Sequence, residues 1–290
     1  MRVWPARYRR RISEFASAYR ASRIGVFGLI VTASFVTMAV FAPLLAPMDP
    51  WKIGTMEEVL TPPSTSHLLG TDEVGRDILS ELMFGTRVSL AIGVLAATIS
   101  AFIGSSLGLI SGYYGGILGD VSMRVTDIFL VIPDLPLMIV LASLLGPSFW
   151  NIIFVIGILG WTGTARIVRS QTLSLKERAY VEASRSIGAS DMYLILHEIA
   201  PNTIPLIFAQ TVIITGRAIM TEAVLSFLGL GDPSQMSWGM MLHYAFASGS
   251  ATFAYWYVVP PGICIAILVL GLTFLGYALD QILNPRLRYR

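Results

Sequence analysis

Long segments without a charged residue constrain this chain more than any other feature. Ile24 to Leu45 and Val88 to Gly119 contain no Asp, Glu, Lys or Arg. Each is long enough to cross the hydrocarbon core of a bilayer, which takes about 20 helical residues. Only 13% of the 290 residues are charged and 54% are hydrophobic, whereas a soluble domain carries about twice that charged fraction. The sequence therefore predicts an all-α integral membrane protein.

The remaining apolar segments bring the expected number of transmembrane helices to six. Ile128 to Ala165 is apolar except for Asp134 and is interrupted at 146–148 (Gly-Pro-Ser), so it fits two spans of about 18 residues each. Pro133 and Pro136 flank Asp134 and indicate a distorted helix end. The last two spans are expected at Thr203 to Leu228 and at Trp256 to Leu279.

Basic residues predict that both termini are cytoplasmic, since loops rich in Lys and Arg stay inside. Residues 1–23 form a basic cytoplasmic tail with seven arginines, and the first span, residues 24–46, is expected to be retained as a signal-anchor. Residues 47–87 hold few bases and suit the outer side. Arginines follow the last span and mark the C-terminus as internal: Arg286, Arg288 and Arg290. The net charge of +2 indicates no nucleic-acid partner.

Three short patterns carry structural expectations only. Gly104, Gly108, Gly112 and Gly116 recur every four residues, which predicts one small-residue face where another helix packs closely. His67, Asp72 and Asp77 fit no metal-ligand spacing, so they are expected to be solvated turn residues, with no metal site in the chain. Asp120, Arg124 and Asp127 are expected to form a short cytoplasmic connection.

The most distinctive segment is a polar island, Val181 to Asn202, between apolar runs. Nothing in Glu182 to Ser186 breaks a helix, and Gly188 gives a permissive backbone for a turn. Ser190 or Asp191 can cap a second helix, which is expected to end at the membrane surface near Pro201. The small residues Ala183, Ser184, Ala189 and Ser190 would let another surface approach closely.

This island resembles the EAA loop of permease subunits of bacterial ABC importers, through Glu182, Ala183, Gly188 and Pro201. It differs at Ser184 and Ala200, where the family more often has Ala and Leu. The resemblance implies a type I importer permease fold and a coupling loop over 170–202 that docks an ATPase. The implied docking residues are Glu182, Ala183, Ser184, Gly188, Ala189, Ser190, Asp191 and Pro201.

Three further segments narrow the resemblance to the dipeptide/oligopeptide/nickel group: 68–90 before the second span, 227–242 in the last outer loop and 279–287 at the end, where Asn284 replaces the usual Asp. The first span with its outer loop is typical of the second, C-type permease of a pair. Residues 88–290 would then form the permease core with five spans. The resemblance implies a multi-pass protein of the bacterial inner membrane.

The resemblance also implies the partners: a homologous second permease, two cytoplasmic ABC ATPases and an extracytoplasmic substrate-binding protein, besides membrane lipid. The chain has two lysines, Lys52 and Lys176, and neither lies in a P-loop. We therefore expect no cofactor in this chain and no enzymatic activity, with ATP and Mg²⁺ bound by the ATPases.

Alternatives remain open at this stage. Arg217 and Glu222 lie five residues apart in a span, about 140° around a helix, so they are not expected to pair. They can lie on the translocation path or contact a second permease or a neighbouring helix. Nickel or another small solute is the second candidate substrate after peptides. An ion-coupled secondary transporter would leave the EAA-like loop unexplained, and a membrane-embedded enzyme lacks convergent catalytic groups.

Overall fold

The computed structural model describes residues 17–283, and within them the chain is helical and has no β-strand beyond one isolated bridge. The long helices and the short ones that connect them are, in chain order, α2 (Arg23–Leu45), η1 (Met56–Glu58), α3 (Ile78–Tyr114), α4 (Gly116–Val131), α5 (Asp134–Leu145), α6 (Phe149–Leu159), α7 (Thr162–Lys176), α8 (Ala179–Ser186), α9 (Asp191–Tyr193), η2 (Leu194–Ile199), α10 (Ala200–Phe227), α11 (Trp238–Ala247), η3 (Ser250–Thr252) and α12 (Tyr255–Leu283).

Six spans are reached in this part of the chain only when two bent helix pairs each count as one. Four helices, α2, α3, the continuous run from α9 into α10, and α12, are long and apolar enough to span a bilayer alone. The other two candidates are α4 with α5, bent by 85°, and α6 with α7, bent by 40°. The expectation of two plain spans within 128–165 is therefore wrong in detail, because helix breaks fall at 132–133 and 160–161 as well as at Gly146.

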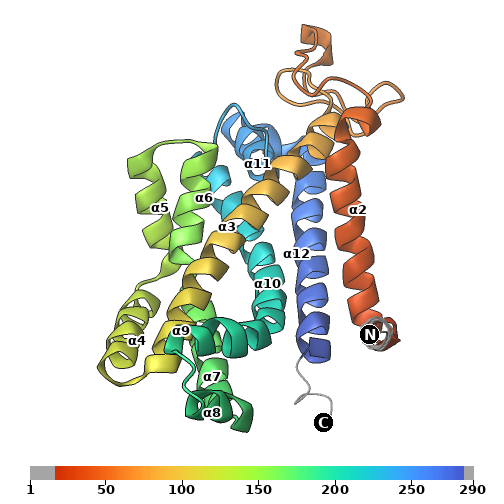
Figure 1. Ribbon diagram of the computed structural model, residues 1–290. Coiled ribbons are helices and arrows are strands. Elements are labelled where there is room, and N and C mark those ends of the chain that lie inside the picture. Colours follow the sequence, from red (N-terminus) through yellow and green to blue (C-terminus); the bar gives the residue numbers. More distant parts are fainter. Residues whose placement is uncertain (1–16, 284–290) are drawn as a thin grey trace.

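The segments that connect the long helices lie at two opposite ends of the bundle, as the distribution of charge predicts. Figure 1 shows the segment between α2 and α3 at one end, together with α11. The loop that carries α7, α8 and α9 lies at the opposite end, as do the start of α2 and the end of α12. The basic residues of 1–16 and the arginines of 284–290 lie outside the described residues.

Glycines on α3 allow it to pack tightly against α7, as predicted. A Cβ atom on Gly104 would lie 2.6 Å from the Trp161 carbonyl oxygen, and one on Gly108 would lie 2.8 Å from that of Ala165. At Gly112 it would lie 2.7 Å from Thr172 Cβ. Gly116 was wrongly assigned to this face: its φ is +50°, it follows the end of α3, and no atom lies within 4 Å of its Cβ position.

The turn before α3 is buried, so the expectation of solvated residues there is wrong. The carboxylate of Asp72 is fully buried, and its Oδ1 accepts the backbone N–H groups of Val74 and Arg76 at 2.9 and 2.7 Å. His67 Nδ1 lies 3.1 Å from Asp77 Oδ1. Asp77 also caps α3, which begins ten residues before the predicted start at Val88. Long-range packing covers these side chains, and turn composition does not reveal it.

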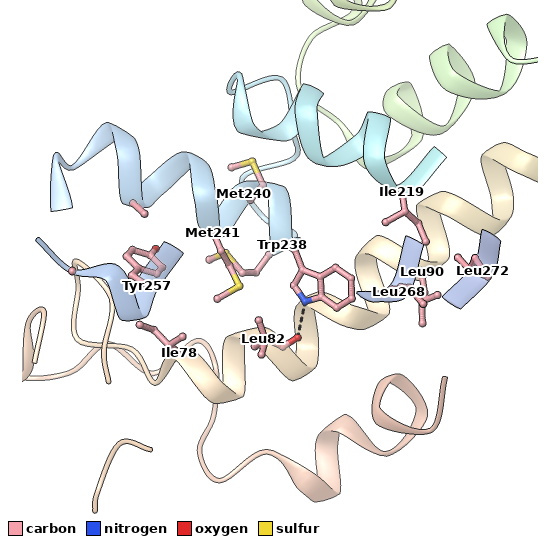
Figure 2. Close-up of a cluster of buried hydrophobic side chains, with 13 residues drawn as sticks. Ile78, Leu82, Leu90, Ile219, Trp238, Met240, Met241, Tyr257, Leu268 and Leu272 are labelled. Carbon is pink, nitrogen blue, oxygen red and sulfur yellow. Dashed lines mark hydrogen bonds between the residues drawn. The ribbon is translucent and has the colours of Figure 1, made fainter. Parts of the chain in front are cut away.

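The largest core cluster joins α3, α10, α11 and α12 around Trp238 (Figure 2). Trp238 is fully buried and its indole Nε1 donates to the Leu82 carbonyl oxygen at 3.0 Å. That carbonyl belongs to α3, so one hydrogen bond joins two segments that are 156 residues apart. The indole is thereby held with its polar group satisfied inside an apolar cluster.

Candidate functional site

The predicted break in the 181–202 island is present. Helix α8 ends at Ser186, and Gly188 adopts φ +91°, a conformation that favours glycine. The Ala189 N–H closes the turn by donating to the Ser184 carbonyl oxygen at 3.1 Å. Ser190 then caps the next helix, because its side-chain oxygen accepts the Tyr193 N–H.

The second helix of the loop does not end near Pro201, which corrects the sequence-based prediction. It continues through α9 and a π-helical turn, η2, into α10 without a gap. Pro201, which has no backbone N–H to donate, lies inside this continuous helix, one residue after the π-helical turn passes into α10. A movement of the loop is therefore connected directly to a membrane-spanning helix.

One face of the loop anchors it and the other is open. Val181, Leu194 and Ile199 are fully buried and pack with the ends of α3 and α7. Ile187 at the tip is 87% exposed and Met192 is 61% exposed. The predicted docking residues Glu182, Ala183, Gly188, Ser190, Asp191 and Pro201 are exposed, and Ser184 and Ala189 are partly exposed. The loop thus presents an apolar tip between polar residues.

Polar contacts fix the loop to α3 and across its own turn. The Tyr113 hydroxyl, at the end of α3, donates to Asp191 Oδ1 at 2.6 Å, and the Arg185 guanidinium lies 5.8 Å from the same ring. Within the loop, Ser184 Oγ donates to Glu198 Oε1 at 3.4 Å. Sequence reasoning did not include Tyr113, because it lies 78 residues from its partner.

Arg217 and Glu222 occupy different environments on α10, in agreement with the expectation that they do not pair. Glu222 is fully buried and accepts hydrogen bonds from Ser226 Oγ at 2.7 Å and from Ser89 Oγ at 3.3 Å. It therefore links α10 to α3 inside the bundle. Arg217 is exposed and lines a cavity of about 420 Å³, together with Asp134 at the start of α5. Asp134 marks the 85° bend, as the flanking prolines predict.

Two acidic residues of α4 form ion pairs with arginines of α7. Arg166 on α7 donates to Asp127 Oδ1 at 2.5 Å, and Arg169 Nη2 lies 3.8 Å from Asp120 Oδ1. Asp120, Arg124 and Asp127 belong to α4 and not to a loop, which corrects the sequence-based expectation. In the described part of the chain, no group of three His, Cys, Asp or Glu side chains is placed to hold a metal ion.

A multi-pass helical bundle with an exposed loop at the end predicted to be cytoplasmic is the architecture expected of a membrane permease. Comparison with family models agrees. The chain belongs to the family of binding-protein-dependent transport system inner membrane components, whose model matches residues 104–289. A second model, the N-terminal transmembrane domain of oligopeptide transport permease C, matches residues 12–63.

Curated relatives extend the similarity over nearly the whole chain. The dipeptide transport system permease protein of Alkalihalophilus pseudofirmus is 36% identical over 93% of this chain and 88% of its own length. The oligopeptide transport system permease protein of Bacillus subtilis is 36% identical over the same shares. The dipeptide permease protein of Haemophilus influenzae is 36% identical over 96% of this chain and 95% of its own.

Proposed function

We propose that this chain is the C-type membrane-spanning subunit of an ATP-driven importer of dipeptides or oligopeptides. The substrate class is supported by relatives that are named as dipeptide and oligopeptide permeases at 36% identity over almost their full length. The energy coupling is supported by the loop that places an exposed apolar tip at the end of the molecule where basic residues predict the cytoplasm.

The proposed partners are a homologous second permease, two ABC ATPases and an extracytoplasmic binding protein. ATP and Mg²⁺ would bind to the ATPases, and this chain would be a transport subunit without an enzymatic role. An apolar tip such as Ile187 and Met192 is suited to insert into a hydrophobic pocket, with the surrounding polar residues forming a rim. Exposed apolar side chains on a water-facing loop indicate a binding surface.

Movement of the docked loop would reach the membrane by two routes. The first is the continuous path from α9 through η2 into α10. The second is α3, which the Tyr113–Asp191 hydrogen bond attaches to the loop and which packs along α7 through its glycines. Rigid-body movement of these helices relative to a second permease would produce alternating access.

Charge substitution at the tip tests this docking. Met192→Asp is expected to abolish co-purification of the ATPase from cells that express the complete importer, because a carboxylate in an apolar pocket carries a large desolvation cost. Met56→Asp is the matched control: Met56 is 93% exposed and lies in η1, in the segment at the opposite end of the molecule. ATPase recovery that is the same for both variants would contradict docking at this loop.

A further inference from the structure

The cavity beside Arg217 is open to the surface of the chain and is built from separate parts of the sequence. Its wall includes Ser100 on α3, Thr164 on α7, Gln210 on α10 and the residues of the break between α4 and α5. Its volume of about 420 Å³ is in the range of pockets that hold small molecules.

Opposite charges face this cavity. Arg217 and Asp134 both line it and both are exposed. Among the described residues no carboxylate forms an ion pair with Arg217, and Asp134 Oδ1 accepts only the neighbouring Leu135 N–H, at 2.9 Å. Charges within spanning helices are costly and mark pathways or ligand contacts. An unpaired guanidinium and an unpaired carboxylate therefore remain available to a ligand with both charges.

The break between α4 and α5 brings two helix ends to the cavity, the C-terminus of α4 and the N-terminus of α5 at Asp134, and their dipoles have opposite signs there. α4 ends at Val131, and the last turn of a helix leaves carbonyl groups without intrahelical partners. Leu130 and Ile132 line the cavity next to Asp134. Carbonyl groups at a helix C-terminus and a carboxylate both favour a cation.

Uncharged hydrogen-bonding groups complete the lining. Thr162, Thr164, Gln210 and Thr221 are spread over α7 and α10. The Thr164 hydroxyl oxygen is buried and has no hydrogen-bond partner within residues 17–283. Apolar side chains such as Met138 and Ile156 form the rest of the wall. A short peptide has matching chemistry: two charged ends, amide groups and apolar side chains.

We propose that this cavity is a binding site within the permease for the zwitterionic backbone of a short peptide. Arg217 pairs with the C-terminal carboxylate, and Asp134 holds the N-terminal ammonium. The permease thus selects its substrate by charge in addition to any selection made by the binding protein. This inference rests on the proposed function, because it names the contacts of a peptide during import.

Equilibrium binding to the purified membrane complex in nanodiscs, without the soluble binding protein, tests the site. The probes are dialanine, dialanine amide and N-acetyl-dialanine. Wild-type complex is expected to bind dialanine about 10- to 100-fold more tightly than either blocked peptide, since each block removes one charged hydrogen bond. In Arg217→Gln, dialanine and its amide should bind within about threefold of each other.

The other variants separate the two ends of the ligand. Asp134→Asn should remove the preference over N-acetyl-dialanine and keep the preference over the amide. Arg217→Lys should retain most of the carboxylate preference, because the positive charge stays. Arg87→Gln is the matched control: it removes an arginine from α3 that is exposed, lies against Phe84 and does not line the cavity. It should behave as wild type.

Three results would overturn the inference: no binding of dialanine to the wild-type complex, equal effects of Arg217→Gln on all three probes, or loss of the second permease from the Arg217→Gln complex. The last would make Arg217 a subunit contact. Failure of the proposed function gives a different result, since the complete importer, binding protein included, would then take up no peptide at all.

Discussion

The turn at Gly188 provides a quantitative test of the coupling loop. Gly188 has φ +91°, and no atom lies within 4 Å of the position that a Cβ would occupy. The cost of Gly188→Ala in this chain is therefore conformational and not steric. A residue with a Cβ in the left-handed region costs about 1–2 kcal/mol. That cost corresponds to a decrease of about 5- to 30-fold in the equilibrium constant between the loop conformation that docks and the unstrained loop.

The assay is a titration of the purified ATPase onto the permease complex in nanodiscs. Gly188→Ala is expected to raise the Kd for the ATPase about 5- to 30-fold. Gly188→Asn should have a smaller effect although Asn is larger, because Asn adopts positive φ more readily. Gly262→Ala on α12 is the control, since its Cβ position also has no neighbour within 4 Å and its φ is not in the left-handed region.

The order of the two variants decides the outcome. If Gly188→Asn weakens docking much more than Gly188→Ala, the bulk of the side chain against the ATPase matters and the backbone reasoning is refuted. If neither variant changes the Kd, Gly188 has no role in docking. A change at Gly262→Ala of the same size would show that the effect is not specific to the loop.

Three further outcomes are expected. Gly108→Val should cost about 1–3 kcal/mol by overpacking against α7 and lower the Tm, whereas Gly262→Val should leave the Tm unchanged. Tyr113→Phe removes the hydrogen bond to Asp191, which is worth about 1 kcal/mol. In the permease measured without its ATPase, amide exchange in the loop should therefore rise about fivefold while the rest of the chain stays folded. Burial raises the pKa of Asp72, so the native state holds a proton that the unfolded chain releases. Wild-type stability should fall as pH rises from the usual carboxyl pKa through the raised one, and thermal melts of Asp72→Asn should show a smaller fall.

Local sequence patterns predicted the features that depend on nearby residues. Charge-free length predicted the spans, since a bilayer sets the length that a helix needs. The four-residue repeat predicted the α3–α7 contact at Gly104, Gly108 and Gly112. The turn at Gly188 and the cap at Ser190 followed from backbone and side-chain preferences within the segment itself.

Features that depend on distant residues were not predicted. Asp72 and His67 occur among turn-forming residues, yet both are buried in the folded chain. The residues around Tyr113 did not indicate its hydrogen bond, because its partner Asp191 lies 78 residues away in the loop. Hydropathy likewise detected the apolar length of 128–165 and the prolines marked the bend at Asp134, but the break at 160–161 was not predicted.

The central claim is that ATP hydrolysis on a partner, acting through residues 179–199, drives peptide transport through this chain. Its most direct test is uptake of radiolabelled dialanine into proteoliposomes that contain the complete importer and an external binding protein. Wild type is expected to accumulate dialanine only when ATP is available to the ATPases, and Met192→Asp should abolish uptake while the two permeases remain associated. ATP-independent uptake, or unchanged uptake in Met192→Asp, would contradict the claim.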